Sequence, residues 1–366
     1  MNFIKTPRLV VDLIRVEENI KQMAEKVISA GLIFRPHFKT HQSHFIAKIF
    51  KKYGVDKCTV SSMGMANYFA ADGWNDISVA FPANVNEYEE INTLAKQIKL
   101  QILVDSIEKI ELLKKKIDSS LGIYIEVDTG YFRSGLMFNQ INEIEALIDA
   151  ILEVPQFSFL GFLSHTGNTY SQTSSAAIIS LFEESKKKLI DLKKHFSNEF
   201  PEIILSMGDT PAASLASDFS GIDELRPGNF VFFDVSQYIL GSCNLNSIAV
   251  AVYCPVVAKY PERNQVVIYG GGVHLSKEKT KMNGAEIFGF VAIPNQNDFG
   301  NTIENCYVIS LSQEHGIIQL PDNYNLERIK LGDSLCILPI HSCMTVDLNS
   351  ELYSIDGQII KKYRTY

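Results

Sequence analysis

The residue with the clearest potential for covalent chemistry is Lys39, which follows an apolar run at residues 32–36 and has His37 and His41 as close neighbours in the sequence. A lysine is usually solvated and lies on the surface. An amine that is partly desolvated beside cationic or imidazole groups has a lowered pKa and can form a Schiff base with a carbonyl compound. The neighbours of Lys39 therefore favour a covalent function that requires a ligand with a carbonyl group.

Glycines and short polar residues gather in two later segments, and both are suited to binding phosphate. One segment contains Ser206, Gly208 and Thr210, and the other contains Arg226, Gly228 and Asn229. Backbone N–H groups and short hydroxyls bind phosphate in the loops after the last two strands of many barrels. Either segment alone is equally consistent with an ordinary turn. Together they favour a phosphorylated ligand, and the phosphorylated cofactor that brings an aldehyde to Lys39 is pyridoxal 5′-phosphate (PLP).

A second candidate centre is the pair His341 and Cys343, two residues apart at the end of a predicted strand at residues 334–340. Alternate residues of a strand point to the same face, so the imidazole and the thiol are expected to lie side by side. Imidazole with thiolate suits Zn²⁺, and water and substrate could fill the remaining positions of a catalytic site. A buried cysteine beside a hydrogen-bonded histidine is the alternative.

Short β-branched runs alternate with amphipathic segments over the first two-thirds of the chain, and these elements must position the candidate residues. Eight runs predict strands, at residues 32–36, 58–62, 76–82, 100–106, 122–128, 157–165, 202–208 and 224–228. Helical patterns at residues 41–53, 86–98, 140–154 and 174–200 lie between them. Eight successive units predict a parallel (β/α)8 TIM-like barrel over residues 12–236, with its site at the carboxyl ends of the strands. A doubly wound sheet is the alternative, although it usually has fewer strands.

After about residue 240 the pattern changes to β-rich runs, which indicates a second, mostly β domain. The runs cover residues 247–259, 265–270, 306–311, 334–340 and 350–363, and no helix of any length is expected among them. An apolar run at residues 9–13 precedes the first full unit and is expected to pair with this domain. We therefore predict a PLP-binding barrel at residues 12–236 and a β-rich domain at residues 1–11 plus 237–366 that carries the metal pair.

Composition limits the classes of partner and the compartment. Among 366 residues, 34 Lys and Arg against 42 Asp and Glu leave a net charge of −8, so the chain lacks the basic surface that nucleic acid or anionic lipid selects. The six cysteines show no C-x-x-C spacing, and we find neither a signal segment nor an apolar stretch of transmembrane length. We expect a protein of the reducing cytoplasm that binds neither nucleic acid nor membrane.

Four segments together resemble the alanine-racemase-type (fold type III) PLP enzymes, and within them the metal-dependent D-threonine aldolase and D-serine dehydratase family. They are RPHFKTH at residues 35–41, HTGNTY at residues 165–170, LRPGNF at residues 225–230 and IHSCMT at residues 340–345. The match spans nearly the whole chain in the same order. This resemblance implies a barrel followed by a β domain, assembled as a homodimer.

The resemblance also implies a role for each candidate residue. Lys39 is expected to carry the cofactor aldehyde and His165 to stack on the ring, with His37 beside them. Arg133 and Tyr170 are expected near the ring, and either Arg226 or Tyr170 faces the pyridine nitrogen. The phosphate is expected to bind Ser206, Gly208, Thr210, Gly228 and Asn229.

The same resemblance favours a metal pair over a structural pair at His341 and Cys343, with Zn²⁺ as the first choice of cation and Mn²⁺ as the second. D-Threonine aldolases tend to carry Asp at the second ligand position and D-serine dehydratases Cys, so Cys343 favours the dehydratase. The implied activity is that of a PLP- and metal-dependent lyase on small D-3-hydroxy amino acids, which yields a keto acid and ammonia or glycine and an aldehyde. An amino-acid racemase is the alternative, and a noncatalytic PLP-binding protein is a third reading.

Overall fold

The computed structural model describes residues 4–363, which divide into two compact units. We name residues 21–228 the barrel unit and residues 4–20 with 229–363 the β unit. The division falls between Gly228 and Asn229, whereas the sequence pattern placed the domain boundary at residue 236. Residues just after Gly228 belong to the β unit because they bond to it: the N–H of Ser342 donates to Asp234 at 2.9 Å.

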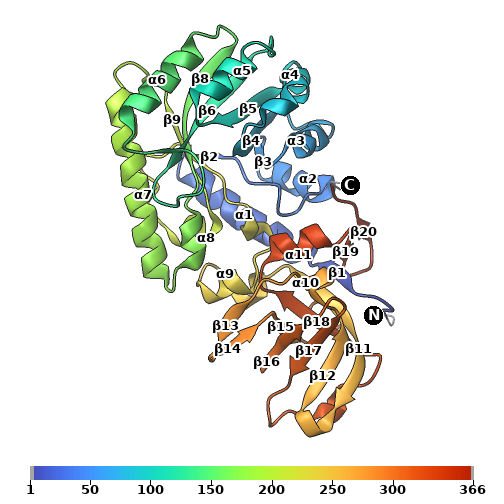
Figure 1. Ribbon diagram of the computed structural model, residues 1–366. Helices are drawn as coiled ribbons and strands as arrows, with labels where there is room; N and C mark the ends of the chain where they lie inside the picture. Colours follow the sequence, from blue (N-terminus) through green and yellow to red (C-terminus); the bar gives the residue numbers. More distant parts are fainter. Residues whose placement is uncertain (1–3, 364–366) are drawn as a thin grey trace. The chain divides into compact units, whose positions relative to one another are not determined.

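Eight parallel strands form a nearly closed barrel in the barrel unit (Figure 1). Their order is β2, β10, β9, β8, β6, β5, β4 and β3, and a parallel bridge between His37 and Thr59 joins the two ends. The TIM-like barrel is thereby confirmed over the doubly wound sheet, whose edges stay open. The strands are β2 (Ile33–Phe34), β3 (Cys58–Val60), β4 (Asp76–Pro82), β5 (Lys99–Val104), β6 (Leu121–Asp128), β8 (Phe157–Ser164), β9 (Ile204–Met207) and β10 (Glu224–Leu225), with β7 (Leu136–Met137) beside β6.

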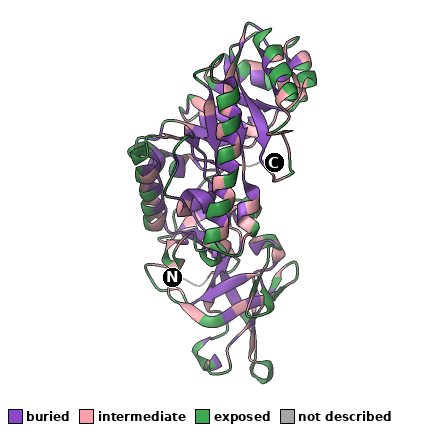
Figure 2. Cartoon of the chain, turned by 90° about the vertical axis from the view of Figure 1, so that its left-hand side faces the viewer, coloured by how far each residue is buried: buried purple, intermediate pink, exposed green. Residues whose placement is uncertain are grey.

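Amphipathic helices alternate with these strands. In α7, Ile178, Phe182, Leu189 and Phe196 recur at helical spacing and are buried, while the opposite side is exposed (Figure 2). Ser174 begins α7 by accepting the N–H of Ala177. The helices are α1 (Leu13–Ser29), α2 (His44–Lys52), α3 (Met63–Ala70), α4 (Tyr88–Ala95), α5 (Ile107–Leu113), α6 (Ile141–Leu152), α7 (Ser175–Phe196) and α8 (Thr210–Leu215). None of the helices within residues 4–363 combines the length and apolar character needed to cross a membrane.

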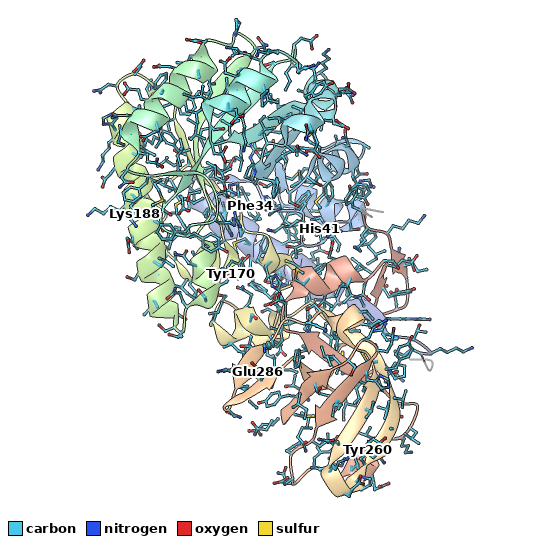
Figure 3. The ribbon with its side chains drawn as sticks, viewed as in Figure 1. Phe34, His41, Tyr170, Lys188, Tyr260 and Glu286 are labelled. Atoms are coloured by element: carbon cyan, nitrogen blue, oxygen red, sulfur yellow. The ribbon has the colours of Figure 1, made fainter. Side chains whose placement is uncertain are left out.

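The side chain of His41 lies in the core of the barrel unit, although the sequence suggested it as a neighbour of Lys39 (Figure 3). Its ring centroid lies 4.5 Å from that of Phe38 and 5.6 Å from that of Phe50. Nδ1 accepts the N–H of Ser43 at 3.1 Å. Burial among aromatic rings lowers the pKa of His41 to about 3, so the ring is neutral in the folded protein.

We expect His41 to make the protein less stable in acid. Its folded pKa of about 3 lies below the ordinary value of 6.5, so this contribution to stability is present above pH 6.5 and is lost as the pH falls toward 3. At about pH 5 the loss for one such histidine is about 2 kcal/mol, because each pKa unit corresponds to about 1.4 kcal/mol. Urea unfolding at neutral pH and at about pH 5 measures this loss of unfolding free energy in wild type and in His41→Asn. An equal acid loss in both proteins would contradict the assignment.

The β unit is built on a ring of six antiparallel strands, in the order β11, β12, β17, β16, β15, β18 and back to β11 (Figure 1). Residues 8–11 pair with β11, and β19 and β20 extend the sheet from there. The strands are β1 (Arg8–Val11), β11 (Val250–Tyr260), β12 (Gln265–Tyr269), β15 (Gly289–Ala292), β16 (Thr302–Leu311), β17 (His315–Gln319), β18 (Ser334–Pro339), β19 (Leu352–Ser354) and β20 (Ile359–Ile360), with a separate hairpin of β13 (Thr280–Met282) and β14 (Ala285–Ile287).

Two short helices lie after residue 240, where the sequence predicted none, and a third lies just before it. They are α9 (Val235–Ile239), α10 (Gly272–Leu275) and α11 (Ser342–Leu348). Each has seven residues or fewer, so none spans enough turns to show a helical periodicity in the sequence. The helix α11 carries Cys343, one member of the predicted metal pair.

Candidate active site

The predicted cofactor residues of the barrel unit lie just beyond the carboxyl ends of its strands. Lys39 follows β2, Arg133 follows β6, His165 follows β8, Thr210 begins α8 after β9, and Arg226 follows β10. The strands run parallel, so their carboxyl ends form one rim of the barrel. The structure therefore gathers residues on one rim that are far apart in the sequence.

Lys39 lies beside a buried and uncharged imidazole. Its side chain is exposed, whereas the sequence suggested partial desolvation, and its backbone N–H donates to Nδ1 of His37 at 3.3 Å. Burial, followed by the positive charges of Lys39 and Arg226, holds the pKa of His37 well below its ordinary value. This part of the rim therefore combines an accessible amine with a neutral imidazole that accepts a hydrogen bond.

His165 is held in one orientation and one protonation state. Its Nδ1 lies 2.5 Å from the carbonyl oxygen of Gly208, and because a carbonyl only accepts, Nδ1 carries the proton. Burial, followed by the charge of Arg133, lowers the pKa of His165 to about 3. A neutral ring that is tied to the backbone through one nitrogen can offer a flat face to a ligand.

Arg226 extends from the end of β10 and is 4% exposed. Its Nε donates to the hydroxyl of Ser206 at 2.6 Å, and its Nη2 donates to the carbonyl oxygen of Ser164 at 2.7 Å. Burial lowers the pKa of Arg226 to about 10, although the nearby carboxylate of Glu224 acts in the opposite direction. The guanidinium is therefore still protonated at neutral pH and is fixed by acceptors on neighbouring strands.

Ser206 connects Arg226 to a chain of buried ion pairs that the sequence analysis missed. Its hydroxyl accepts from Arg226 and donates to Glu224 at 2.6 Å. The other oxygen of Glu224 accepts from Arg35 at 2.6 Å, and Arg35 also pairs with Asp76 at 2.5 Å. The sequence offered one indication of these ion pairs, because charged residues occur within or beside two predicted strands. They are Arg35 after β2 and Glu224 in β10. Because its hydroxyl is bonded on both sides, Ser206 is placed to support Arg226 rather than an external phosphate.

Thr210 and Tyr170 meet at the turn after β9. Thr210 is fully buried, and its backbone N–H donates to the hydroxyl oxygen of Tyr170 at 3.2 Å. Asp209, which the sequence analysis did not select, accepts from Thr166 at 2.6 Å and from Thr169 at 2.9 Å. These bonds hold the loop after β8, which carries Tyr170, against the turn after β9.

Gly208 and Gly228 allow segments of the barrel to approach each other closely. A Cβ at Gly208 would lie 2.8 Å from the Cβ of Arg226, and one at Gly228 would lie 2.8 Å from the Cβ of His37. Such contacts are too short for any larger side chain at either position. Gly208 therefore lets the turn after β9 lie close to Arg226, and Gly228 lets the segment after β10 lie close to His37.

Arg133 and Glu126 belong to the segment around the end of β6. The side chain of Arg133 is exposed, and its guanidinium lies 5.3 Å from the centre of the Tyr131 ring. Glu126 is 4% exposed, and burial raises its pKa. One of its oxygens accepts from Ser134 at 2.8 Å, and the other is buried without a hydrogen-bond partner among residues 4–363. The sequence analysis did not select Glu126. The only indication of it in the sequence is an acidic residue within a largely apolar strand run.

The predicted metal pair lies at the start of a helix, which corrects its predicted place on a strand. The strand β18 ends at Pro339, since proline has no N–H to continue the ladder, and His341 is the residue that caps α11. Cys343, the second residue of α11, hydrogen-bonds the imidazole of His341. Burial disfavours the charged ring, but Cys343, Asp234 and Glu278 outweigh it and raise the pKa of His341 to about 9. Negative surroundings of this kind favour a cation.

Within residues 4–363, His341 and Cys343 have no third side chain of His, Cys, Asp or Glu placed to complete a metal site with them. No group of three or more His, Cys, Asp or Glu side chains among residues 4–363 is arranged to hold a metal ion. A cation bound by His341 and Cys343 therefore keeps coordination positions for water or substrate. Asn229, which the sequence placed at the phosphate, lies in the β unit with its side chain 3.7 Å from the sulfur of Cys343.

Comparison with known proteins agrees with this arrangement. A model described as "Alanine racemase, N-terminal domain" matches residues 11–236. The chain belongs to the alanine racemase-type family. A second model, described as "Putative serine dehydratase domain", matches residues 249–355. The chain thus combines the alanine racemase-type barrel with the β domain of a narrower group, as the resemblance of its four segments implied.

Individual relatives of this alanine racemase-type chain match it over its whole length. It is 29% identical to a D-serine dehydratase from Dictyostelium discoideum, over 100% of this chain and 97% of that protein. The solved structure of D-threo-3-hydroxyaspartate dehydratase from Delftia sp. HT23 superposes with a TM-score of 0.91 at 25% identity, over 99% of this chain and 98% of that one. A cysteine-to-alanine mutant of that dehydratase in the metal-free form has the same TM-score of 0.91, the same 25% identity and the same coverage of 99% and 98%.

Proposed function

We propose that this protein is a PLP- and divalent-metal-dependent lyase that acts on small D-3-hydroxy amino acids, with dehydration to a keto acid and ammonia as its main reaction. The observation that carries the proposal is the joint presence of Lys39 at the barrel rim and the His341 and Cys343 pair at the start of α11. The full-length similarity to proteins named D-serine dehydratase and D-threo-3-hydroxyaspartate dehydratase supports it.

The barrel rim fits PLP by charge and by shape. Lys39, Arg133 and Arg226 all act as positive charges on the imidazole of His37, and such a site suits a dianionic phosphate. Thr210 and the backbone around Gly208, Gly228 and Asn229 are the groups that would hold the phosphate. When bound, PLP supplies an aldehyde that links to amines and a ring that withdraws electrons from the attached carbon.

The side chains of this chain then have separate tasks. Lys39 would hold the aldehyde in the resting enzyme and, once released from it, would take the proton from Cα of the substrate. The neutral ring of His165, oriented by Gly208, would pack on the cofactor ring. Arg226, held by Ser206, is assigned to the pyridine nitrogen, while Tyr170, bonded to the N–H of Thr210, is assigned to the phosphate end.

A cation at His341 and Cys343 complements that role of Arg226. A fixed positive charge facing the pyridine nitrogen opposes its protonation and weakens the ring as an electron acceptor. A divalent cation held by His341 and Cys343 would supply Lewis-acid polarisation of the β-hydroxyl of the substrate, which would compensate for that weakness. Zn²⁺ suits an imidazole and thiolate pair best, with Mn²⁺ as the alternative, and the metal-free form of the dehydratase mutant is consistent with a metal in that relative.

Product analysis of the PLP-loaded protein with D-serine, D-threonine and D-threo-3-hydroxyaspartate tests the proposal. A keto acid and ammonia, formed in a chelator-sensitive reaction, is the expected result, whereas glycine and an aldehyde would identify an aldolase. Chelator-insensitive interconversion of enantiomers would identify a racemase and overturn the proposal. Tight PLP binding without turnover of any of these compounds would identify a noncatalytic carrier.

We also propose a homodimer in the cytoplasm without nucleic-acid or membrane partners. The net charge of −8 supports the absence of anionic partners, and the reactive thiol of Cys343 requires a reducing compartment to bind metal as a thiolate. Light scattering on the PLP-loaded protein measures the oligomeric state, and a monomer at all concentrations would contradict the dimer.

A further inference from the structure

We propose that Asn229 is a positioning residue for the metal pair, and that it acts with Asp234 and Ser342 to hold Cys343 in place for a divalent cation. This inference rests on the proposed function, because it takes His341 and Cys343 as the ligands. It also separates the side chain of Asn229, which serves the metal, from its backbone, which we expect near the phosphate.

The amide of Asn229 is buried and points its nitrogen at three acceptors. Asn229 is 4% exposed, and its Nδ2 lies 2.6 Å from Oδ2 of Asp234. A carboxylate only accepts, so the atom facing it must be the amide nitrogen. The same nitrogen lies 3.0 Å from Oγ of Ser342 and 3.7 Å from Sγ of Cys343. One proton bonds Asp234, and the second is shared between Ser342 and the sulfur of Cys343.

This shared proton has a clear chemical consequence at Cys343. A thiolate carries a full negative charge, so an N–H aimed at it forms a stronger hydrogen bond than it forms with a thiol. The amide of Asn229 therefore favours the ligand form of the sulfur and restricts the direction in which it points. Such bonds to a metal ligand from outside the coordination sphere raise metal affinity.

Asp234 holds the residue that stands between the two ligands. Its Oδ2 accepts from the backbone N–H of Ser342 at 2.9 Å, and its Oδ1 accepts from the N–H of Gln237 at 2.9 Å. Asp234 is 1% exposed, so these bonds are shielded from water. Because Ser342 is the only residue between His341 and Cys343, anchoring its backbone sets the separation of the imidazole and the thiol.

The oxygen of the Asn229 amide has a different environment from the nitrogen. Its Oδ1 is buried and makes no hydrogen bond within residues 4–363. Buried acceptors are rarely left unpaired, because the desolvated group loses free energy. A water bound to the cation in one of its open positions could donate to this oxygen. The same amide would then contact both the sulfur ligand and the coordination sphere of the metal.

Metal titration of the PLP-loaded enzyme after chelation tests the proposal. We expect Asn229→Ala to bind Zn²⁺ about 10- to 100-fold more weakly than wild type, the range found for groups that support metal ligands. Binding of Co²⁺ should also show a changed thiolate-to-cobalt absorption band. The affinity for PLP should stay within about two-fold of wild type, because the backbone of residue 229 is retained.

The control is Asn264→Gly, which removes an amide that donates to the carbonyls of Leu320 and Pro321 at 3.0 Å. Asn264 has a positive φ of 53°, so glycine keeps its backbone conformation. Metal affinity equal to wild type in this control, with weaker affinity in Asn229→Ala, supports the proposal. If the Zn²⁺ affinity of Asn229→Ala lies within about two-fold of wild type, the proposal is overturned. We take a factor of about two as the error of such a titration.

A second variant covers the case in which Asn229→Ala does not fold. Ser342→Ala removes an acceptor of Asn229 and a donor to Asp234 while leaving the backbone bond intact, and it should weaken Zn²⁺ binding less than Asn229→Ala does. Unchanged affinity in a folded Ser342→Ala would also count against the proposal. If wild type itself binds no metal through His341 and Cys343, the proposed function fails at its metal site. If wild type binds metal and Cys343→Ala does not, unaltered binding by Asn229→Ala refutes the role of Asn229 alone.

Discussion

Replacing Lys39 by alanine is expected to lower turnover of D-3-hydroxy amino acids by about 10³-fold or more, because one amine both holds the aldehyde and moves the Cα proton. Lys39 follows β2 on the barrel rim and is exposed, so a substrate amine can reach the position it occupies. The rate of keto-acid formation measures the loss. The visible absorbance of the lysine-linked cofactor should disappear, while the cofactor remains bound through its phosphate.

The matched control is Lys48→Ala in α2, nine residues further along the chain. The side chain of Lys48 is 65% exposed, and its Nζ lies 3.5 Å from Oδ1 of Asp72. This variant should keep the absorbance and the rate of wild type. A small primary amine added to Lys39→Ala should restore part of the rate, because it can replace the missing base. Substantial turnover by Lys39→Ala without added amine would remove Lys39 from the mechanism.

The second large effect is expected at Cys343, where alanine should lower both the metal content and the rate. Polarising a hydroxyl leaving group contributes several kcal/mol, so we expect a loss of about 10²-fold or more in dehydration. The imidazole of His341 alone cannot hold a cation at the affinity of an imidazole and thiolate pair. Metal analysis of the purified protein and the rate of ammonia release measure the two effects. Chelation of wild type should reproduce the loss, and added Zn²⁺ should reverse it in wild type only.

Cys306→Ala is the control for the removal of a thiol from the β unit. Cys306 lies in β16 and is fully buried, and burial raises the pKa of its thiol to about 12, so it stays protonated and inert. Metal content and rate in this variant should equal those of wild type. Equal activity of Cys343→Ala and Cys306→Ala would show that the chemistry does not need the pair.

The sequence predicted the barrel strands well because each of them shows a local pattern. All eight strands lie within or next to the predicted runs, and the four predicted helical patterns contain α2, α4, α6 and α7. The ring of the β unit was harder to predict. The predicted runs did not include β15 and β17, and the closure of β11 against β12 is a contact that no local pattern records.

For the site, the sequence indicated which residue types follow which strands, but it could not indicate what each side chain touches. Lys39, His165, Thr210 and Arg226 follow strands whose carboxyl ends share one rim, as the order of elements predicts. Ser206 was predicted to bind the phosphate, yet its hydroxyl bonds Arg226 and Glu224. The inward or outward direction of a strand residue depends on register, and register is a property of the closed sheet.

What the sequence determined by itself is therefore the barrel, the amine at its rim and the pairing of an imidazole with a thiol. Only the tertiary structure decided that His41 belongs to the aromatic core, that Cys343 lies in the first turn of a helix, and that the amide of Asn229 faces the sulfur of Cys343. Asn229 and Cys343 are 114 residues apart, and they meet through hydrogen bonds made after the chain has folded. Local patterns record the periodicity of neighbouring residues, whereas contacts at this separation depend on the packing of the whole unit.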